Sequence, residues 1–153
     1  MRIGVFTALY QQFDFEEALD KAVAAGVSAV EIGVGGYPGS QHCRVDDLLA
    51  GAGERRAFLD AIQSRGLLLS ALSVHNNPLH PDAAVARQAD EDLCRAIRLA
   101  QGLGVPVVNG FSGLPAGAPG DTMPNWVTCP WPPEFLQMLD YQWNEVAVPY
   151  WRE

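Results

Sequence analysis

The sequence is short of positive charge, of cysteine and of long apolar runs, and each shortage excludes a class of protein. Lys and Arg number 10 against 18 Asp and Glu, a net charge of −8. Nucleic acids and anionic membranes bind basic surfaces, so neither is expected as a partner. No apolar run approaches the ~20 residues of a membrane span, and polar Thr7 comes too early for a signal-peptide core. The cysteines, Cys43, Cys94 and Cys129, are odd in number and form no C-x-x-C motif, which favours a cytoplasmic location.

The sequence does contain enough apolar residues for one domain with its own core. Of the 153 residues, 48% are hydrophobic and 18% are charged. Apolar runs and helical spacing predict strands that alternate with helices. The predicted strands are 3–9, 28–33, 67–75 and 105–109; the predicted helices begin after Asp14, span 45–65 and 81–103, and begin again at Pro132. This alternation implies parallel strands joined by right-handed crossovers.

Local signals set the limits and faces of the predicted helices. Asp14 and Glu17 resemble a capping box, and Gly26 suits the left-handed conformation that ends a helix. The second helix is expected to be interrupted near Gly51 and Gly53. The apolar faces expected to be buried comprise Leu93, Ala96, Ile97 and Ala100 in the third helix, and Phe135, Leu136, Leu139, Trp143 and Val146 in the fourth. The Gly- and Pro-rich segment 111–133 is the one long connection, a feature that is commonly functional.

Two α/β architectures fit this order of elements. An open, flavodoxin-like sheet gathers ligands at one switch point, whereas a (β/α)8 barrel brings the ends of all its strands to one mouth. Here all four predicted strands end in polar residues, which favours the barrel, and four βα units are about half of one. Period-two alternation predicts that Leu67, Leu69, Ala71, Ser73 and His75 share one face, toward the barrel interior.

Several of these strand ends carry candidate binding residues. His75 can bind a hydroxyl or transfer a proton, and Asn76 follows it directly. Glu31 lies in an otherwise apolar strand, where a carboxylate needs a partner; it binds substrate or forms a structural ion pair. Tyr10 and Asn109 follow the first strand and end the fourth. The alternative for each is a structural role.

Two loops add further candidates. The segment 33–39 is rich in glycine, but it matches neither the dinucleotide fingerprint nor a P-loop; His42 follows it and is expected to reach the mouth. Trp131 lies in a proline-stiffened loop and is expected to stack on a sugar ring; the alternative is that it fills the core. Neither Cys43 nor Cys129 has a paired base in the sequence, so a catalytic thiol is not expected.

Taken in order, these segments resemble a known family. The resemblance rests on residues 1–7, Val30-Glu31-Ile32-Gly33 with the Gly-Tyr-Pro-Gly loop and His42, and residues 73–81, 109–113 and 125–133. Together they are similar to the sugar phosphate isomerase/epimerase family, the xylose isomerase-like barrels. The resemblance implies a (β/α)8 barrel that isomerises or epimerises a sugar, a sugar phosphate or an inositol derivative through an enediolate.

The resemblance also implies a divalent metal, Mn, Mg, Co or Zn. The family's usual ligands are Glu, Asp, His and Glu from later strands, so no metal ligand is expected in residues 1–153, and the catalytic residues stay unassigned. The resemblance carries over Glu31, His42, His75 and Asn109 as groups near the mouth, with His75 the best match as a substrate-binding residue.

The leading hypothesis is therefore that residues 1–153 form the N-terminal part of a metal-dependent sugar isomerase or epimerase with a carbohydrate substrate. One alternative is a non-catalytic sugar-binding or self-associating half barrel, which would be a homo-oligomer that buries its open strand edges. A small flavodoxin-like phosphate binder is weaker, because the glycine fingerprint fails. Zinc-binding barrel endonucleases are disfavoured by the net charge of −8.

Overall fold

A computed structural model describes residues 1–153, which divide into two compact units. The first unit comprises Met1–His75 and Asp92–Gly110, and the second comprises Asn76–Glu91 and Phe111–Glu153. The strands are β1 (Gly4–Phe6), β2 (Ala29–Gly36), β3 (Leu68–His75) and β4 (Val108–Gly110). The helices of the first unit are α1 (Phe15–Ala24), α2 (Val45–Ala50), α3 (Ala52–Gln63) and the C-terminal part of α4 (Ala83–Leu103).

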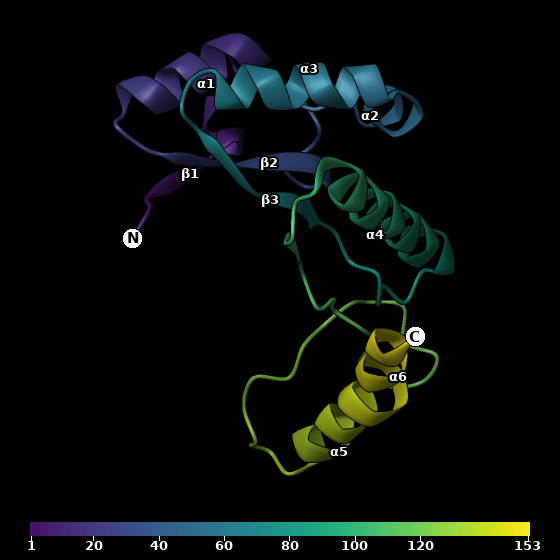
Figure 1. The fold of residues 1–153 in the computed structure, drawn as a ribbon. Coiled ribbons are helices and arrows are strands. Elements are labelled where there is room, and N and C mark those ends of the chain that lie inside the picture. Colours follow the sequence, from purple (N-terminus) through teal and green to yellow (C-terminus); the bar gives the residue numbers. More distant parts are fainter. The chain divides into compact units, whose positions relative to one another are not determined.

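The first unit is a four-stranded parallel sheet covered by helices on one face. The strands pair in the order β1-β2-β3-β4, and α1, α2 and α3 lie on one side of β1 and β2 (Figure 1). A flavodoxin-like sheet would need a reversal of strand order, and this sheet has none. The predicted architecture, about half of a (β/α)8 barrel, is therefore confirmed.

The capping and stop signals act as the sequence predicts. Asp14 Oδ1 accepts a hydrogen bond from the Glu17 backbone N–H (2.9 Å) and so caps α1. Gly26 follows α1 with φ of +75°, a conformation that glycine adopts without strain. Gly51 separates α2 from α3, which confirms the predicted interruption.

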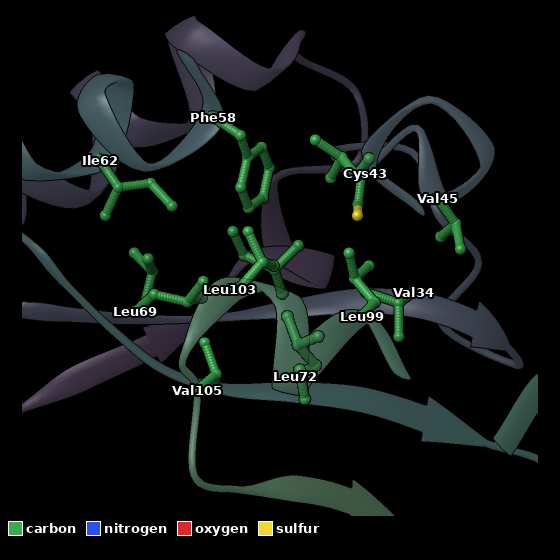
Figure 2. Close-up of a cluster of buried hydrophobic side chains, with 14 of the residues drawn as sticks. Val34, Cys43, Val45, Phe58, Ile62, Leu69, Leu72, Leu99, Leu103 and Val105 are labelled. Atoms are coloured by element: carbon green, nitrogen blue, oxygen red, sulfur yellow. The ribbon is translucent and has the colours of Figure 1, made fainter. Parts of the chain in front are cut away.

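The core lies between the sheet and the helices. Phe58 and Ile62 of α3 point toward Leu69 and Leu72 of β3 (Figure 2). Phe15 of α1 stacks on Phe58 with ring centroids 4.8 Å apart. A second set of buried core residues comes from α4: Ala96, Leu99, Ala100 and Leu103. These packed side chains hold the strands in a fixed register.

The buried face of α4 differs from the predicted one at a single residue. Ala96 and Ala100 are buried as expected, and Leu93 is half-buried against the core. Ile97, however, is 52% exposed, so the prediction that it faces the core is wrong. Leu99 is buried instead. The buried residues Ala96, Leu99, Ala100 and Leu103 follow helical spacing of three and four residues, and Ile97 lies outside this face.

The strand limits also differ from the prediction. β1 ends at Phe6, and Thr7–Tyr10 turn into a 3-10 helix, so the predicted strand 3–9 is too long. β2 continues through the first glycines to Gly36, and β4 is confined to Val108–Gly110. β2 extends through these glycines because their pairing with β3 outweighs the low strand propensity of glycine.

A β-bulge in β3 changes which side chains share a face. Val30 of β2 aligns with Leu69, but the next residue, Glu31, aligns with Ala71, so Ser70 is the extra residue. The prediction that five alternating residues from Leu67 to His75 share one face is therefore wrong. Before the bulge Leu67 and Leu69 face the core; after it Leu72 and Val74 do so, and Ala71, Ser73 and His75 face the opposite side.

The second unit consists of the N-terminal part of α4, the long connection 111–133 and a C-terminal helical region. That region comprises α5 (Glu134–Asp140), a π-helical segment (Tyr141–Ala147) and α6 (Val148–Arg152). Its predicted apolar face is only partly buried: Phe135, Leu139 and Val146 are half-buried, whereas Leu136 and Trp143 are exposed. The fully buried side chains of this region are Ala147 and Gln142. The polar Gln142 is buried because its amide binds the long connection. None of the helices is both long and apolar enough to cross a membrane.

Candidate functional site

Polar and aromatic side chains gather on the helix-free face of the sheet, toward the carboxyl ends of the strands. Phe6 of β1 aligns with Glu31 of β2, and Ser73 of β3 aligns with Asn109 of β4. Aligned residues of parallel strands share a face, and the bulge places Ser73 on the same face as Glu31. His75 follows two residues after Ser73 on this face. We call these five residues the sheet-face cluster.

The centre of the cluster is a hydrogen bond between neighbouring strands. The Ser73 hydroxyl donates to Glu31 Oε1, and Ser73 is fully buried while Glu31 is half-buried. A hydroxyl that donates to a carboxylate is a charge-assisted bond, which is stronger than one between neutral groups. Glu31 Oε2 makes no hydrogen bond within the chain. The carboxylate is thus fixed by one oxygen, and the other is available to a ligand.

His75 lies at the end of β3 and is held from two sides. Its ring makes an edge contact with Phe6, with centroids 5.8 Å apart and planes at 65°. Its carbonyl accepts a hydrogen bond from the Tyr37 N–H (2.7 Å). Gly36, at φ +67°, lies against this backbone: a Cβ there would come within 2.5 Å of the His75 oxygen. The glycine is therefore required for the chain after β2 to approach His75.

Two polar residues at the strand ends were noted in the sequence but were not assigned a binding role. Ser73 is one, although a serine in an apolar strand beside the Glu31 strand was a usable signal. Thr7 is the other: it follows β1, is fully buried, and its Oγ1 has no hydrogen-bond partner. An unpaired buried hydroxyl lowers the free energy of unfolding by about 1–3 kcal/mol. Thr7 therefore destabilises the folded chain at this strand end.

Two predicted residues of the first unit lie away from the sheet-face cluster. His42 is buried, and its Nε2 donates to the Phe13 carbonyl (3.1 Å). It lines a hollow of about 340 Å³ among the helices, together with Phe15 and Phe58. Tyr10 is half-buried and packs against the core. The structure thus brings together Glu31, His75 and Asn109 but not His42 or Tyr10, and no finding tests a binding role for any of them.

The other two predicted residues belong to the second unit. Asn76 Nδ2 donates to the Ala89 carbonyl (3.2 Å) and so ties the segment after β3 to α4. Trp131 is 72% exposed, so it does not fill the core of its unit. Trp126 instead makes an edge contact with Trp143, with ring centroids 5.1 Å apart. A ligand-stacking role for Trp131 stays a prediction.

The residues of this chain do not provide a metal site. In residues 1–153, no group of three or more His, Cys, Asp or Glu side chains is arranged to hold a metal ion. Glu31 and His75 are the ligand types present in the sheet-face cluster, and a protein metal site commonly needs three or four ligands. The sheet-face cluster therefore supplies at most two of the ligands that a divalent metal needs, and we derive no step through one.

The buried thiol is also unsuited to catalysis. Desolvation raises the pKa of Cys43 to about 12, so it is protonated at neutral pH. A nucleophilic cysteine reacts as the thiolate, which this environment suppresses. The buried environment therefore disfavours a catalytic thiol at Cys43, and none was expected from the sequence.

Comparison with known proteins places this geometry in a family. The family model described as xylose isomerase-like TIM barrel matches residues 19–146. The uncharacterized protein YfiH of Bacillus subtilis (strain 168) is 36% identical over 155 residues, an alignment that covers 100% of this chain and 49% of that protein. The chain thus spans about half the length of the curated relative it matches. The family includes sugar isomerases and epimerases. Four parallel βα units in sequence order and a match over most of its length show that the chain belongs to the xylose isomerase-like TIM barrel family.

Proposed function

We propose that residues 1–153 form the N-terminal part of a sugar or sugar-phosphate isomerase or epimerase, in which the sheet-face cluster binds the carbohydrate. The observation that carries this proposal is the Glu31 carboxylate, held by Ser73 on the helix-free face beside His75 and Asn109. In barrels of this type the carboxyl ends of the strands form the mouth of the active site. The substrate and the activity belong to the proposal.

The cluster supplies groups suited to sugar hydroxyls. Glu31 Oε2 accepts a hydrogen bond from a hydroxyl, and the Asn109 amide both donates and accepts. The His75 imidazole binds a further hydroxyl or carbonyl oxygen. Such contacts orient the substrate so that the carbon next to its carbonyl faces the base that removes the proton. That base is not assigned to a residue of this chain.

The test is turnover by the native polypeptide with a panel of ketoses, aldoses and inososes, each with divalent metals supplied. We expect one of these sugars to be isomerised or epimerised, and Glu31→Gln to raise KM at least about tenfold, because the amide presents an NH2 group in place of a carboxylate oxygen. Glu91→Gln, which removes an exposed carboxylate on α4, is the control and should leave KM unchanged. Absence of turnover across the panel, with no divalent metal bound, would exclude the proposed activity.

A second candidate is a non-catalytic, self-associating half barrel. It is favoured by Leu68, an apolar side chain that is exposed on the helix-free face and that a second chain would cover. Sedimentation distinguishes the candidates: a dimer of the native polypeptide that binds sugar without converting it supports this second function, and an active monomer contradicts it.

A further inference from the structure

The hollow beside His42 lies among the helices that cover the sheet, away from the sheet-face cluster. It has a volume of about 340 Å³ and is lined by residues of α1, α2, α3 and the segment 41–44 that precedes α2. All of these elements belong to the first unit. The volume falls within the range of about 300–1,000 Å³ that small-molecule sites occupy.

The buried part of the lining is apolar, apart from the histidine. Cys43, Leu48 and Phe58 are buried and face the hollow. Phe15 stacks on Phe58 with the ring planes at 9°, so the two rings form one aromatic wall. The apolar part of a ligand that enters the hollow is removed from water against these side chains, which favours binding.

His42 supplies a buried hydrogen-bond acceptor to the hollow. It is 5% exposed, and its Nε2 donates to the Phe13 carbonyl, so Nδ1 of the neutral ring is an acceptor. Nδ1 makes no hydrogen bond within the chain. Thr7 Oγ1 is the one fully enclosed polar side-chain atom without a partner in residues 1–153, so Nδ1 is not fully enclosed and is open to the hollow. A ligand N–H or O–H would complete its hydrogen bonding.

The exposed rim of the hollow carries more carboxylates than cations. Glu16, Asp47 and Glu54 line it, together with the Arg44 guanidinium. Asp47 pairs with Arg44 (3.2 Å) and Glu16 pairs with Arg65 (2.7 Å), whereas Glu54 makes no ion pair. An anionic ligand would meet an uncompensated carboxylate at the rim and an acceptor nitrogen inside, and both disfavour it.

We propose that this hollow binds a small aromatic molecule with one N–H or O–H donor and no negative charge, of which indoles and phenols are examples. The ring packs on Phe15, Leu48 and Phe58, and the donor bonds to His42 Nδ1. A polyol would leave most of its hydroxyls without partners against the apolar walls, which is costly. A metal ion would lack the three or four ligands that it commonly needs. The proposal does not rest on the proposed function, because no residue of the sheet-face cluster lines the hollow.

The test is calorimetric titration of the native polypeptide with three matched probes. The probe 3-methylindole carries the N–H donor, N-methylindole has the same size without the donor, and indole-3-acetate retains the donor but adds a negative charge. We expect N-methylindole to bind at least about threefold more weakly than 3-methylindole, because it cannot donate to His42 Nδ1. Indole-3-acetate should also bind more weakly than 3-methylindole. Equal affinity of the two methylindoles would overturn the proposal, as would tighter binding of indole-3-acetate.

Two variants test whether the ligand occupies the hollow while His42, which also holds the Phe13 carbonyl, stays in place. Ala57 of α3 is exposed and lines the hollow, so Ala57→Leu fills part of it and should weaken 3-methylindole binding at least about tenfold. Ala52→Leu places the same side chain on the same helix at an exposed position outside the hollow, and should leave binding unchanged. Equal binding by Ala57→Leu and Ala52→Leu would overturn the proposal.

Nuclear magnetic resonance separates this site from the sheet-face cluster. We expect 3-methylindole to shift the amide signals of Gln41, Cys43 and Phe58, which line the hollow. Shifts confined to Glu31 and Asn109 would overturn this proposal and leave the proposed function intact.

Discussion

Ser73 is the residue on which the geometry of the sheet-face cluster depends most. It is fully buried, and its hydroxyl is the group that holds Glu31 across the gap between β2 and β3. An alanine in its place would leave the carboxylate without this donor while changing little else in volume. Ser73 is thus a buried residue of the sheet that sets the position of the Glu31 carboxylate on the helix-free face.

We predict that Ser73→Ala lowers the free energy of unfolding by about 1.5–3 kcal/mol, the value of a hydrogen bond to a charged group. Chemical denaturation measures this change. The double variant with Glu31→Gln isolates the pair, since the loss should be smaller when the charge is already absent. Additive losses in the two variants would show that Ser73 and Glu31 are not coupled.

Gly36 controls how closely the chain approaches His75. We predict that Gly36→Ala lowers the free energy of unfolding by more than the roughly 1–3 kcal/mol of left-handed backbone strain, because its Cβ would also meet the His75 oxygen at 2.5 Å. Gly39→Ala is a matched control, since Gly39 has nearly the same φ, +66°, and no atom within 4 Å of its Cβ position. If both variants unfold at the same denaturant concentration, the close approach to His75 is not real.

Cys43 and Cys129 should differ sharply in reactivity. Cys43 is buried with a pKa raised by desolvation to about 12, whereas Cys129 is exposed. We predict that iodoacetamide at neutral pH labels Cys129 while Cys43 reacts only after denaturation, because the thiolate is the reactive form. Mass spectrometry of the labelled peptides measures both rates. Labelling of Cys43 at the rate of Cys129 in the native protein would contradict the buried position.

Among the secondary-structure elements, the π-helical segment has a role that the sequence analysis did not predict: it supplies the side chain that bonds the long connection. Gln142 is fully buried, donates to two carbonyls and to Asn125 Oδ1 (3.1 Å), and accepts from the Val127 N–H (3.3 Å). It therefore satisfies backbone groups of a connection that has no sheet or helix of its own to pair with. This one side chain therefore makes several of the hydrogen bonds that order the long connection.

We predict that Gln142→Leu lowers the free energy of unfolding by at least about 2 kcal/mol, because several buried polar groups lose their partners. The same substitution at exposed Gln137 is the control and should cost less than about 0.5 kcal/mol. Limited proteolysis gives a second measurement, with faster cleavage within 111–133 in Gln142→Leu. Unchanged cleavage and stability would show that the connection is held by other contacts.

The sequence predicted the elements well and their faces less well. Strands, helix caps and the interruption at Gly51 follow from local signals, because capping and glycine conformations are local properties. The extra residue Ser70 cannot be read from a period-two pattern, since apolar residues lie on both sides of it. Gln142 was missed because a polar residue on a helix is ordinarily exposed, and only the partners supplied by the long connection explain its burial.

The residues of the candidate site were likewise predicted only in part. Glu31, His75 and Asn109 were predicted because polar residues in or after buried strands stand out from their neighbours. His42 and Tyr10 also follow strands, but turns carry them away from the sheet face, to the Phe13 carbonyl and to the core. Turn geometry over several residues depends on tertiary contacts, so sequence distance from a strand was a poor guide there.

Taken together, the four βα units are those of a family barrel, with polar chemistry on the face that a barrel turns inward. The helix-covered face holds the core, and the opposite face carries Glu31, Ser73, His75 and Asn109. The net charge of −8 suits a small neutral sugar better than a polyanion such as a nucleic acid. We propose that this face binds a substrate whose carbon-bound proton is exchanged.

Exchange of that proton with solvent is the most direct test. The native polypeptide is incubated in deuterated water with each sugar of the panel and with divalent metals, and deuterium at carbon is followed by nuclear magnetic resonance. We predict incorporation next to the carbonyl of one sugar, reduced at least about tenfold by Glu31→Gln and unchanged by Glu91→Gln. Absence of exchange with every sugar, or exchange at the same rate in Glu31→Gln, would contradict the proposed binding of substrate by this face.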